Sequence, residues 1–150
     1  MLTFRDITLA DRDLVMPMVQ AFYQTDAVDH PVDQAILDRS FLAAADHAEP
    51  LLRGVLIYDG QEPAGYLYVT QCYSAEVGGR CIFIEELFLK EAFRGKGLGR
   101  AILTWLEEQY PSARRFRLEV TQVNQGAARL YERMGYQYLR YDQMVLDKSR

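Results

Sequence analysis

Three strand-like runs follow one another in the middle of this chain and constrain its fold more than any other feature. They cover residues 51–58, 64–73 and 81–89. All three are rich in β-branched and aromatic residues, which suit a pleated, half-buried surface. Asp59-Gly60, a strong hairpin signal, separates the first two runs, and Gly78-Gly79 marks a turn before the third. The pattern predicts an antiparallel meander at the centre of the fold.

Helical and further strand patterns flank this meander. The segments before it are a strand at 2–7 and helices near 11–25 and 33–47; those after it are a helix at 98–110, a strand at 115–121, a helix at 125–134 and a closing strand or pair at 137–146. Asp11 can cap the first helix, and Pro17 inside it predicts a bend or a later start. The order β-αα-βββ-α-β-α-β predicts one α/β domain over residues 1–150, with a mixed central sheet flanked by helices.

Charge is distributed unevenly along the chain. The net charge of −4 argues against general nucleic-acid binding, which favours a basic surface. Residues 1–50 carry nine acidic and three basic side chains, whereas residues 51–150 carry twelve acidic and fourteen basic ones. One interpretation is a solvated acidic helix pair. The other is a cationic substrate met by the N-terminal third and an anionic cofactor met by the rest.

Several function classes find no support in the sequence. No apolar run approaches the roughly 20 residues that cross a bilayer, and the N-terminus has no signal-peptide pattern, so we expect a cytoplasmic protein without a membrane role. Cys72 and Cys81 lie in strand-like segments without metal-ligand spacing. In such a compartment they are expected to be reduced core thiols, and no metal site is predicted.

A glycine-rich turn lies between the third run and the next helix. Its sequence is Arg94-Gly95-Lys96-Gly97-Leu98-Gly99. Glycines allow close backbone approach, and a helix N-terminus presents free N–H groups and partial positive charge, so the turn predicts a pyrophosphate site. A nucleotide P-loop would need Lys-Ser or Lys-Thr after the last glycine, and a dinucleotide fingerprint would need a different glycine spacing.

The linked motifs resemble the GNAT N-acetyltransferase family. Arg94-x-x-Gly97-x-Gly99 matches its R/Q-x-x-G-x-G/A signature, and the strand at 84–89 is similar to its cofactor strand. From Asn124 to Tyr136 the chain keeps the spacing N-x-x-A-x-x-L-Y-x-x-x-G-[FY]. The resemblance implies the GNAT acyl-CoA fold and acetyl-CoA as co-substrate, without a metal. The cofactor-binding residues that it implies are Leu87, Phe88, Leu89, Arg94, Gly95, Lys96, Gly97, Leu98, Gly99, Arg100, Asn124 and Tyr131.

Acetyl transfer to an amine requires a base for the ammonium, a polarised carbonyl and an acid for the leaving thiolate. Tyr131 matches the family tyrosine near the CoA sulfur and is the candidate acid, although it also suits a helix core. Glu85, Glu86 and Glu119 are the candidate bases, with Glu85 favoured and relay through water as the remaining alternative. Glu85 and Glu86 should point to opposite faces of their strand unless a bulge intervenes.

The acceptor is the least constrained part of the interpretation. The acidic N-terminal third favours a small cationic amine, attacked directly in a ternary complex. A protein N-terminus or lysine and a non-catalytic acyl-CoA module are the alternatives. Homodimerisation through the segment 136–146 is a further hypothesis, with a simple edge strand as its alternative. The candidates for the wall of the acceptor pocket are Tyr23, Asp26, Tyr66 and Tyr73. His30 and His47 are expected at the surface.

Overall fold

The structure is a computed structural model that describes residues 1–148. Its strands are β1 (Leu2–Asp6), β2 (Leu52–Asp59), β3 (Glu62–Ser74), β4 (Gly79–Leu89) and β5 (Arg115–Leu118). Its α-helices are α1 (Arg12–Phe22), α2 (Gln34–Ala45), α3 (Leu98–Gln109) and α4 (Gln125–Arg133). Two short 3-10 turns, η1 (Leu9–Asp11) and η2 (Glu91–Phe93), precede α1 and α3. Within residues 1–148 no helix is long and apolar enough to cross a bilayer.

The five strands form one mixed sheet in the order β1-β2-β3-β4-β5. Strands β1 to β4 pair antiparallel, and β5 joins the edge parallel to β4 through a helical crossover. Gly60 has a φ of 63°, in the left-handed region that a tight hairpin needs, so the predicted turn is confirmed. The predicted class, a largely antiparallel sheet flanked by helices, is confirmed as well.

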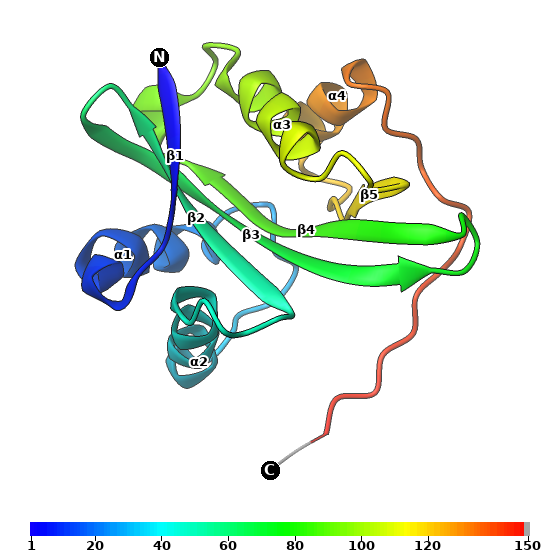
Figure 1. Cartoon of the computed structure of the whole chain (residues 1–150), viewed down its shortest axis with the longest axis horizontal. Coiled ribbons are helices and arrows are strands. Elements are labelled where there is room, and N and C mark those ends of the chain that lie inside the picture. The colour runs from blue at the N-terminus through cyan, green and yellow to red at the C-terminus, as the bar shows by residue number, and fades with distance from the viewer. Residues whose placement is uncertain (149–150) are drawn as a thin grey trace.

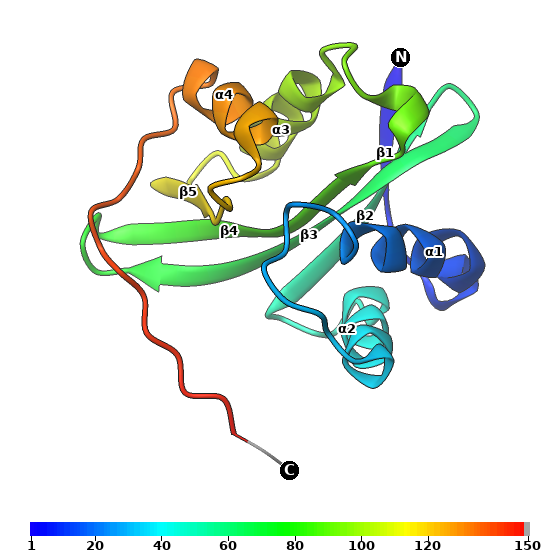
Figure 2. The same cartoon turned by 180° about the vertical axis from the view of Figure 1, so that it is seen from behind.

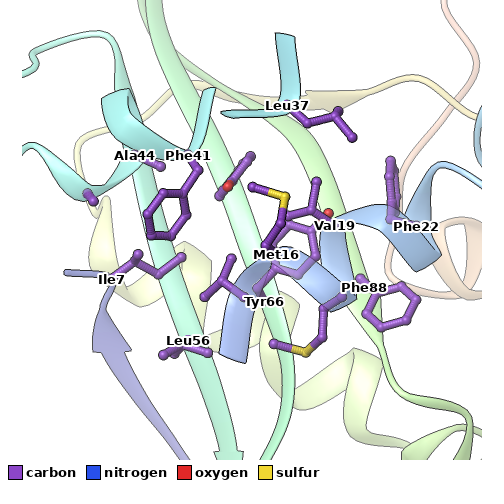
Figure 3. Packing of buried hydrophobic residues seen from close by; sticks show 14 residues of the cluster. Ile7, Met16, Val19, Phe22, Leu37, Phe41, Ala44, Leu56, Tyr66 and Phe88 are labelled. Atoms are coloured by element: carbon purple, nitrogen blue, oxygen red, sulfur yellow. The ribbon is translucent and has the colours of Figure 1, made fainter. Parts of the chain in front are cut away.

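The sheet separates two layers of helices (Figures 1 and 2), with α1 and α2 on one face and α3 and α4 on the other. Alternation along β3 produces this arrangement, because Tyr66 and Tyr68 pack towards α1 and α2 whereas Leu67 and Val69 pack towards α3. Two clusters of buried residues result, one on each face of the sheet. Figure 3 shows the cluster under α1 and α2, in which side chains of both helices pack against Tyr66 of β3 and Phe88 of β4. Its labelled members are Ile7, Met16, Val19, Phe22, Leu37, Phe41, Ala44, Leu56, Tyr66 and Phe88.

The predicted closing strand at 137–146 is wrong, since the described residues after α4 contain no strand. This segment runs past the β3–β4 turn and away from the sheet (Figure 2). Tyr138, Met144, Val145 and Leu146 in it are exposed. A strand needs backbone partners, and this segment shows only side-chain hydrogen bonds, such as that from Tyr141 to Glu76.

Three other details differ from the prediction. Helix α1 begins at Arg12 with Pro17 in its interior, so the later start, one of the two predicted alternatives, is wrong, and the helix ends at Phe22, three residues earlier than expected. Strand β5 ends at Leu118, three residues earlier than expected. Asp11 occupies the N-cap position of α1 but makes no side-chain cap; its carboxylate instead accepts hydrogen bonds from the Thr8 amide and from Arg5, each at 2.8 Å.

Candidate functional site

A β-bulge in β4 gives the two consecutive glutamates their positions. Tyr68 pairs with Glu86 and Val69 with Ile84, so Glu85 is the extra residue in the ladder. The bulge reverses the alternation of the strand, because Ile84 packs in the core under α3 whereas Phe88 packs in the core under α1 and α2. The expectation that the glutamates point to opposite faces is therefore replaced by the bulge alternative.

Glu86 is buried, and tyrosine hydroxyl groups hold it. Tyr23, at the end of α1, donates to Oε2 at 2.5 Å, and Tyr66 of β3 donates to Oε1 at 2.7 Å. Burial raises the pKa of Glu86 above its ordinary value, although the two hydrogen bonds oppose that effect. The buried Tyr68 hydroxyl has no hydrogen-bond partner in the described part of the chain. The site therefore contains a desolvated carboxylate that is hydrogen-bonded but not neutralised.

Glu85 differs from Glu86 because its side chain is exposed. Desolvation around the carboxyl group and then the charges of Glu119 and Glu86 raise its pKa. Glu85 and Glu86 both contribute to raising the pKa of Tyr23, which places both carboxylates near the end of α1. The structure thus gathers Glu85, Glu86 and Glu119 into one acidic group, and Tyr23 joins it.

The acidic group lies beside a divergence of two strands. The β4–β5 pairing runs from Cys81↔Arg115 to Ile84↔Leu118 and stops there. Leu87–Leu89 therefore has no partner strand on its β5 side within the described residues, while β3 pairs with its other side. A strand with one unpaired edge presents free N–H and C=O groups. This edge can form backbone hydrogen bonds with an extended, amide-containing chain.

The glycine turn follows the same strand. Gly95 and Gly97 have φ of 73° and 76°, and no side chain caps the N-terminus of α3 at Gly97. An added Cβ on either glycine would meet nothing within 4 Å, so the turn borders open space. The first N–H groups of a helix have no partner inside the helix. The turn is therefore a cradle of backbone amides that fits an anionic group such as a pyrophosphate.

The other residues of the turn have different surroundings. A Cβ on Gly99 would lie 2.7 Å from Leu130 Cδ2, so this glycine allows α3 to pack closely on α4. Arg94 folds back, because its Nε donates to the Leu89 carbonyl at 2.7 Å. Lys96 and Arg100 are exposed and leave their charges free for a ligand. Leu98, the first residue of α3, supplies one of the free amides.

Asn124 and Tyr131 belong to the α4 region. The Asn124 side chain caps α4 by accepting from the Ala127 amide at 3.4 Å. Tyr131 is half-buried, and burial raises its pKa to about 12, so its hydroxyl stays protonated at neutral pH. Tyr131 and Glu119 line one cavity of about 730 Å³ beside β5 and the C-terminal segment. Glu85 and Glu86 do not line this cavity, but the charge of Glu119 acts on Glu85, so the cavity adjoins the acidic group.

The connection between α1 and α2 begins at Tyr23, which binds Glu86. The Thr121 hydroxyl contacts the Asp26 carbonyl, which joins this connection to the loop after β5. No lysine or arginine in residues 1–148 forms an ion pair with Glu85, Glu86 or Glu119. The described residues also contain no group of three or more potential metal ligands. Glu85, Glu86 and Glu119 therefore have no lysine or arginine counter-ion among the described residues.

Sequence reasoning only partly anticipated this arrangement. Tyr23 and Tyr66 were candidates for the acceptor pocket, but their hydrogen bonds to Glu86 join residues 63 and 20 positions apart. The alternation of Tyr66 and Tyr68 was a signal that both share a face. His30 and His47 are exposed, as expected, and Tyr73 is 73% exposed at the far end of β3. Cys72 is exposed, so its expected core position is wrong, whereas Cys81 is buried.

Comparison with known proteins agrees with the geometry. Residues 15–136 match the model of the acetyltransferase (GNAT) family, and the chain therefore belongs to that family. A possible acetyltransferase from Clostridium difficile has a TM-score of 0.80 at 15% identity over 99% of both chains. A ribosomal-protein-alanine N-acetyltransferase from Brucella melitensis has a TM-score of 0.75 at 15% identity, over 98% of this chain and 99% of that one. A predicted acetyltransferase with acetyl-CoA from Clostridium acetobutylicum has a TM-score of 0.75 at 15% identity, over 97% of this chain and 96% of that one.

Proposed function

We propose that this protein transfers the acetyl group of acetyl-CoA to the primary amine of a small cationic molecule, by direct attack in a ternary complex. The observation that carries the proposal is the unneutralised group of Glu85, Glu86 and Glu119 beside the divergence of β4 and β5. A cationic acceptor would supply the missing counter-charge. The family gives the reaction type, and the acidic group supports a cationic acceptor.

Glu85 is the proposed base. Its side chain is accessible, whereas both oxygens of Glu86 accept hydrogen bonds from tyrosines. A raised pKa suits a base that must take a proton from an ammonium near neutral pH. Glu86 then acts as a positioning residue, because its bonds hold Tyr23 at the end of α1 against β3.

Acetyl-CoA is the proposed second substrate, and three parts of the chain fit it. The amides after Gly97 and the charges of Lys96 and Arg100 would bind the pyrophosphate, and the free edge of Leu87–Leu89 would pair with the pantetheine amides. In the reaction the amine nitrogen bonds to the thioester carbon after Glu85 removes one of its protons. The carbon–sulfur bond then breaks, and the Tyr131 hydroxyl gives the thiolate its proton. The nitrogen loses its second proton to solvent, and the tyrosinate regains a proton from solvent.

A peptide or protein N-terminus is the second candidate acceptor. The structural likeness to a ribosomal-protein-alanine N-acetyltransferase and the position of Glu119 in the cavity with Tyr131 favour it. In that reaction Glu119 would be the base. The Gln143 amide donates to Glu119 at 3.0 Å, so a peptide would need to displace the C-terminal segment from this carboxylate.

The experiment that tests the activity follows CoA release from acetyl-CoA with a thiol reagent across a panel of amines. The panel contains polyamines, amino sugars, aminoglycosides, amino acids and short peptides. Turnover with cationic small molecules is expected, and turnover with peptides alone would move the assignment to the second candidate. No turnover with any acceptor, together with tight acetyl-CoA binding by calorimetry, would contradict the enzymatic proposal.

The cofactor cradle has its own matched test. Gly97→Trp should abolish measurable acetyl-CoA binding, because the new side chain fills the space in front of the α3 amides. Gly78→Trp is the control, since Gly78 has a similar φ of 67° and also borders open space, but lies in the β3–β4 turn. Equal acetyl-CoA affinity in the two variants would show that the glycine turn does not bind the cofactor.

A further inference from the structure

Cys72 and Cys81 lie directly opposite each other near the end of the β3–β4 hairpin. Opposed residues of an antiparallel pair point to the same face, with Cα atoms about 4.5–5.5 Å apart. A disulfide joins Cα atoms roughly 4.4–6.8 Å apart. The two thiols therefore meet the distance requirement for a disulfide without movement of the backbone. The two cysteines are nine positions apart in the sequence. Their opposition follows from the register of β3 and β4, which the sequence spacing alone does not reveal.

The two cysteines differ in solvent exposure. Cys72 is exposed and open to a small reagent, whereas Cys81 is completely buried. On the other side of Cys81, the pairing with β5 brings up Arg115, and Arg117 lies over the Phe83 ring two residues along β4. Burial raises the pKa of the Cys81 thiol, the neighbouring Cys72 adds to this, and both arginines oppose it by favouring the thiolate. An accessible attacking thiol and a sheltered resolving thiol are thus adjacent.

We propose that Cys72 and Cys81 form a reversible cross-strand disulfide when the protein meets a low-molecular-weight disulfide. The inference is independent of the acetyl-transfer reaction, in which neither cysteine takes part. It makes the distal end of the β3–β4 hairpin a redox-sensitive modification site.

The chemistry is ordinary thiol–disulfide exchange. The Cys72 thiolate attacks one sulfur of the small disulfide and releases one small thiol, which leaves a mixed disulfide on Cys72. The Cys81 thiolate then attacks the Cys72 sulfur and releases the second small thiol. Two protein thiols are oxidised to one disulfide, and the small disulfide is reduced to two thiols.

The bond would brace a junction of three parts of the chain. The turn that follows Cys72 contains Glu76, which accepts from Arg115 of β5 at 2.9 Å and from Tyr141 of the C-terminal segment at 2.9 Å. A disulfide at the base of this turn keeps β3 and β4 paired in the native register and restricts the unfolded chain. We expect the oxidised protein to unfold roughly 5 °C higher than the reduced protein.

The test incubates the full chain with oxidised glutathione and measures the intact mass without reductant. The expected product has lost two hydrogen atoms, has no titratable thiol, and yields a linked peptide pair on non-reducing digestion. Cys72→Ser should show no reaction at the buried Cys81, and Cys81→Ala should stop at a glutathione adduct on Cys72. Dithiothreitol should restore the starting mass and the lower unfolding temperature.

A wild-type protein that stops at the glutathione adduct, or that forms only disulfides between chains, would overturn the proposal. Cys72→Ser keeps the exposed surface polar, so it should fold. It therefore provides the reference for the unfolding temperature. An equal rise in that temperature in wild type and in Cys72→Ser on oxidation would equally contradict a bond between these two cysteines.

Discussion

Asp11 and Glu86 are the buried charged side chains of the described chain, and their surroundings are opposite. Asp11, between β1 and α1, faces the Arg5 guanidinium through two bonds of 2.8 and 3.0 Å. Those hydrogen bonds hold its pKa at about 2. Glu86, at the β4 bulge, has tyrosine hydroxyls but no cation, and its pKa is raised. One carboxylate is paired with a cation by the fold, and the other is buried without a cation among the described residues.

The opposite pKa shifts of Asp11 and Glu86 show that ionised Asp11 stabilises the fold whereas ionised Glu86 does not. Asp11 has a lowered pKa, so its contribution to stability is present at neutral pH and is lost as the pH falls from about 4 to about 2. Glu86 and Glu85 have raised pKa values, so their ionised forms oppose folding, and stability is gained when they take up protons. The bulge region therefore keeps charges at a cost to stability, which is typical of a functional site.

The largest expected effect is on catalysis at the bulge. Glu85→Gln should lower kcat by about 10³-fold, because the variant loses the proposed base. Its unfolding temperature should rise slightly, since the variant removes a charge that opposes folding but lies on an exposed side chain. The acid limb of wild-type kcat/KM should lie above the ordinary glutamate pKa and be absent in the variant. A larger loss in Glu119→Gln than in Glu85→Gln would assign the base to Glu119.

Loss of the proposed acid should have the next largest effect. Tyr131→Phe should reduce kcat by about 10²-fold while leaving acetyl-CoA affinity nearly unchanged. Tyr136→Phe is the matched control, because its ring centroid lies 5.7 Å from that of Tyr131 and its buried hydroxyl also lacks a partner among the described residues. Equal rates in Tyr131→Phe and wild type would return Tyr131 to a packing role.

Asp11→Asn should act on stability and leave catalysis intact. The variant keeps the shape of the side chain but loses the ion pair with Arg5, so the free energy of unfolding at pH 7 should fall by about 2 kcal/mol. The gap to wild type should narrow as the pH is lowered from about 4 to about 2 in urea titrations. The control is Asp13→Asn, an exposed neighbour that should change little. A lower kcat in folded Asp11→Asn would contradict the assignment of Asp11 to stability and of the β4 bulge to catalysis.

The smallest expected effect is that of Glu86 on stability. Relative to Glu86→Gln, wild type should gain a small amount of unfolding free energy as the pH is lowered from 8 towards the ordinary glutamate pKa, because the folded protein takes up a proton on Glu86 more readily than the unfolded chain does. The measurement compares urea midpoints of the two proteins at each pH. A wild type that loses stability relative to the variant over this range would show that Glu86 has a hidden cationic partner.

The sequence by itself determined the meander, the helices and the cradle, because each is a local pattern. β-branched and aromatic runs with turn signals between them predicted β2 to β4, and Gly95 and Gly97 marked a turn before α3, where both have positive φ. The linked motifs from Arg94 to Tyr136 indicated the family, and the comparison over residues 15–136 confirmed it. In these segments propensity, periodicity and turn chemistry all agree, so the local sequence is sufficient.

Only the tertiary structure decided which side chains meet. The bulge at Glu85 arises from how β3 and β4 pair, and it brings two adjacent glutamates to the end of α1. The closing strand did not form, because an apolar pattern creates no strand without a backbone partner. Gly99 allows α3 to approach Leu130 of α4, and Asp11 pairs with Arg5 instead of capping α1. All four depend on contacts between elements, and neither periodicity nor composition records those contacts.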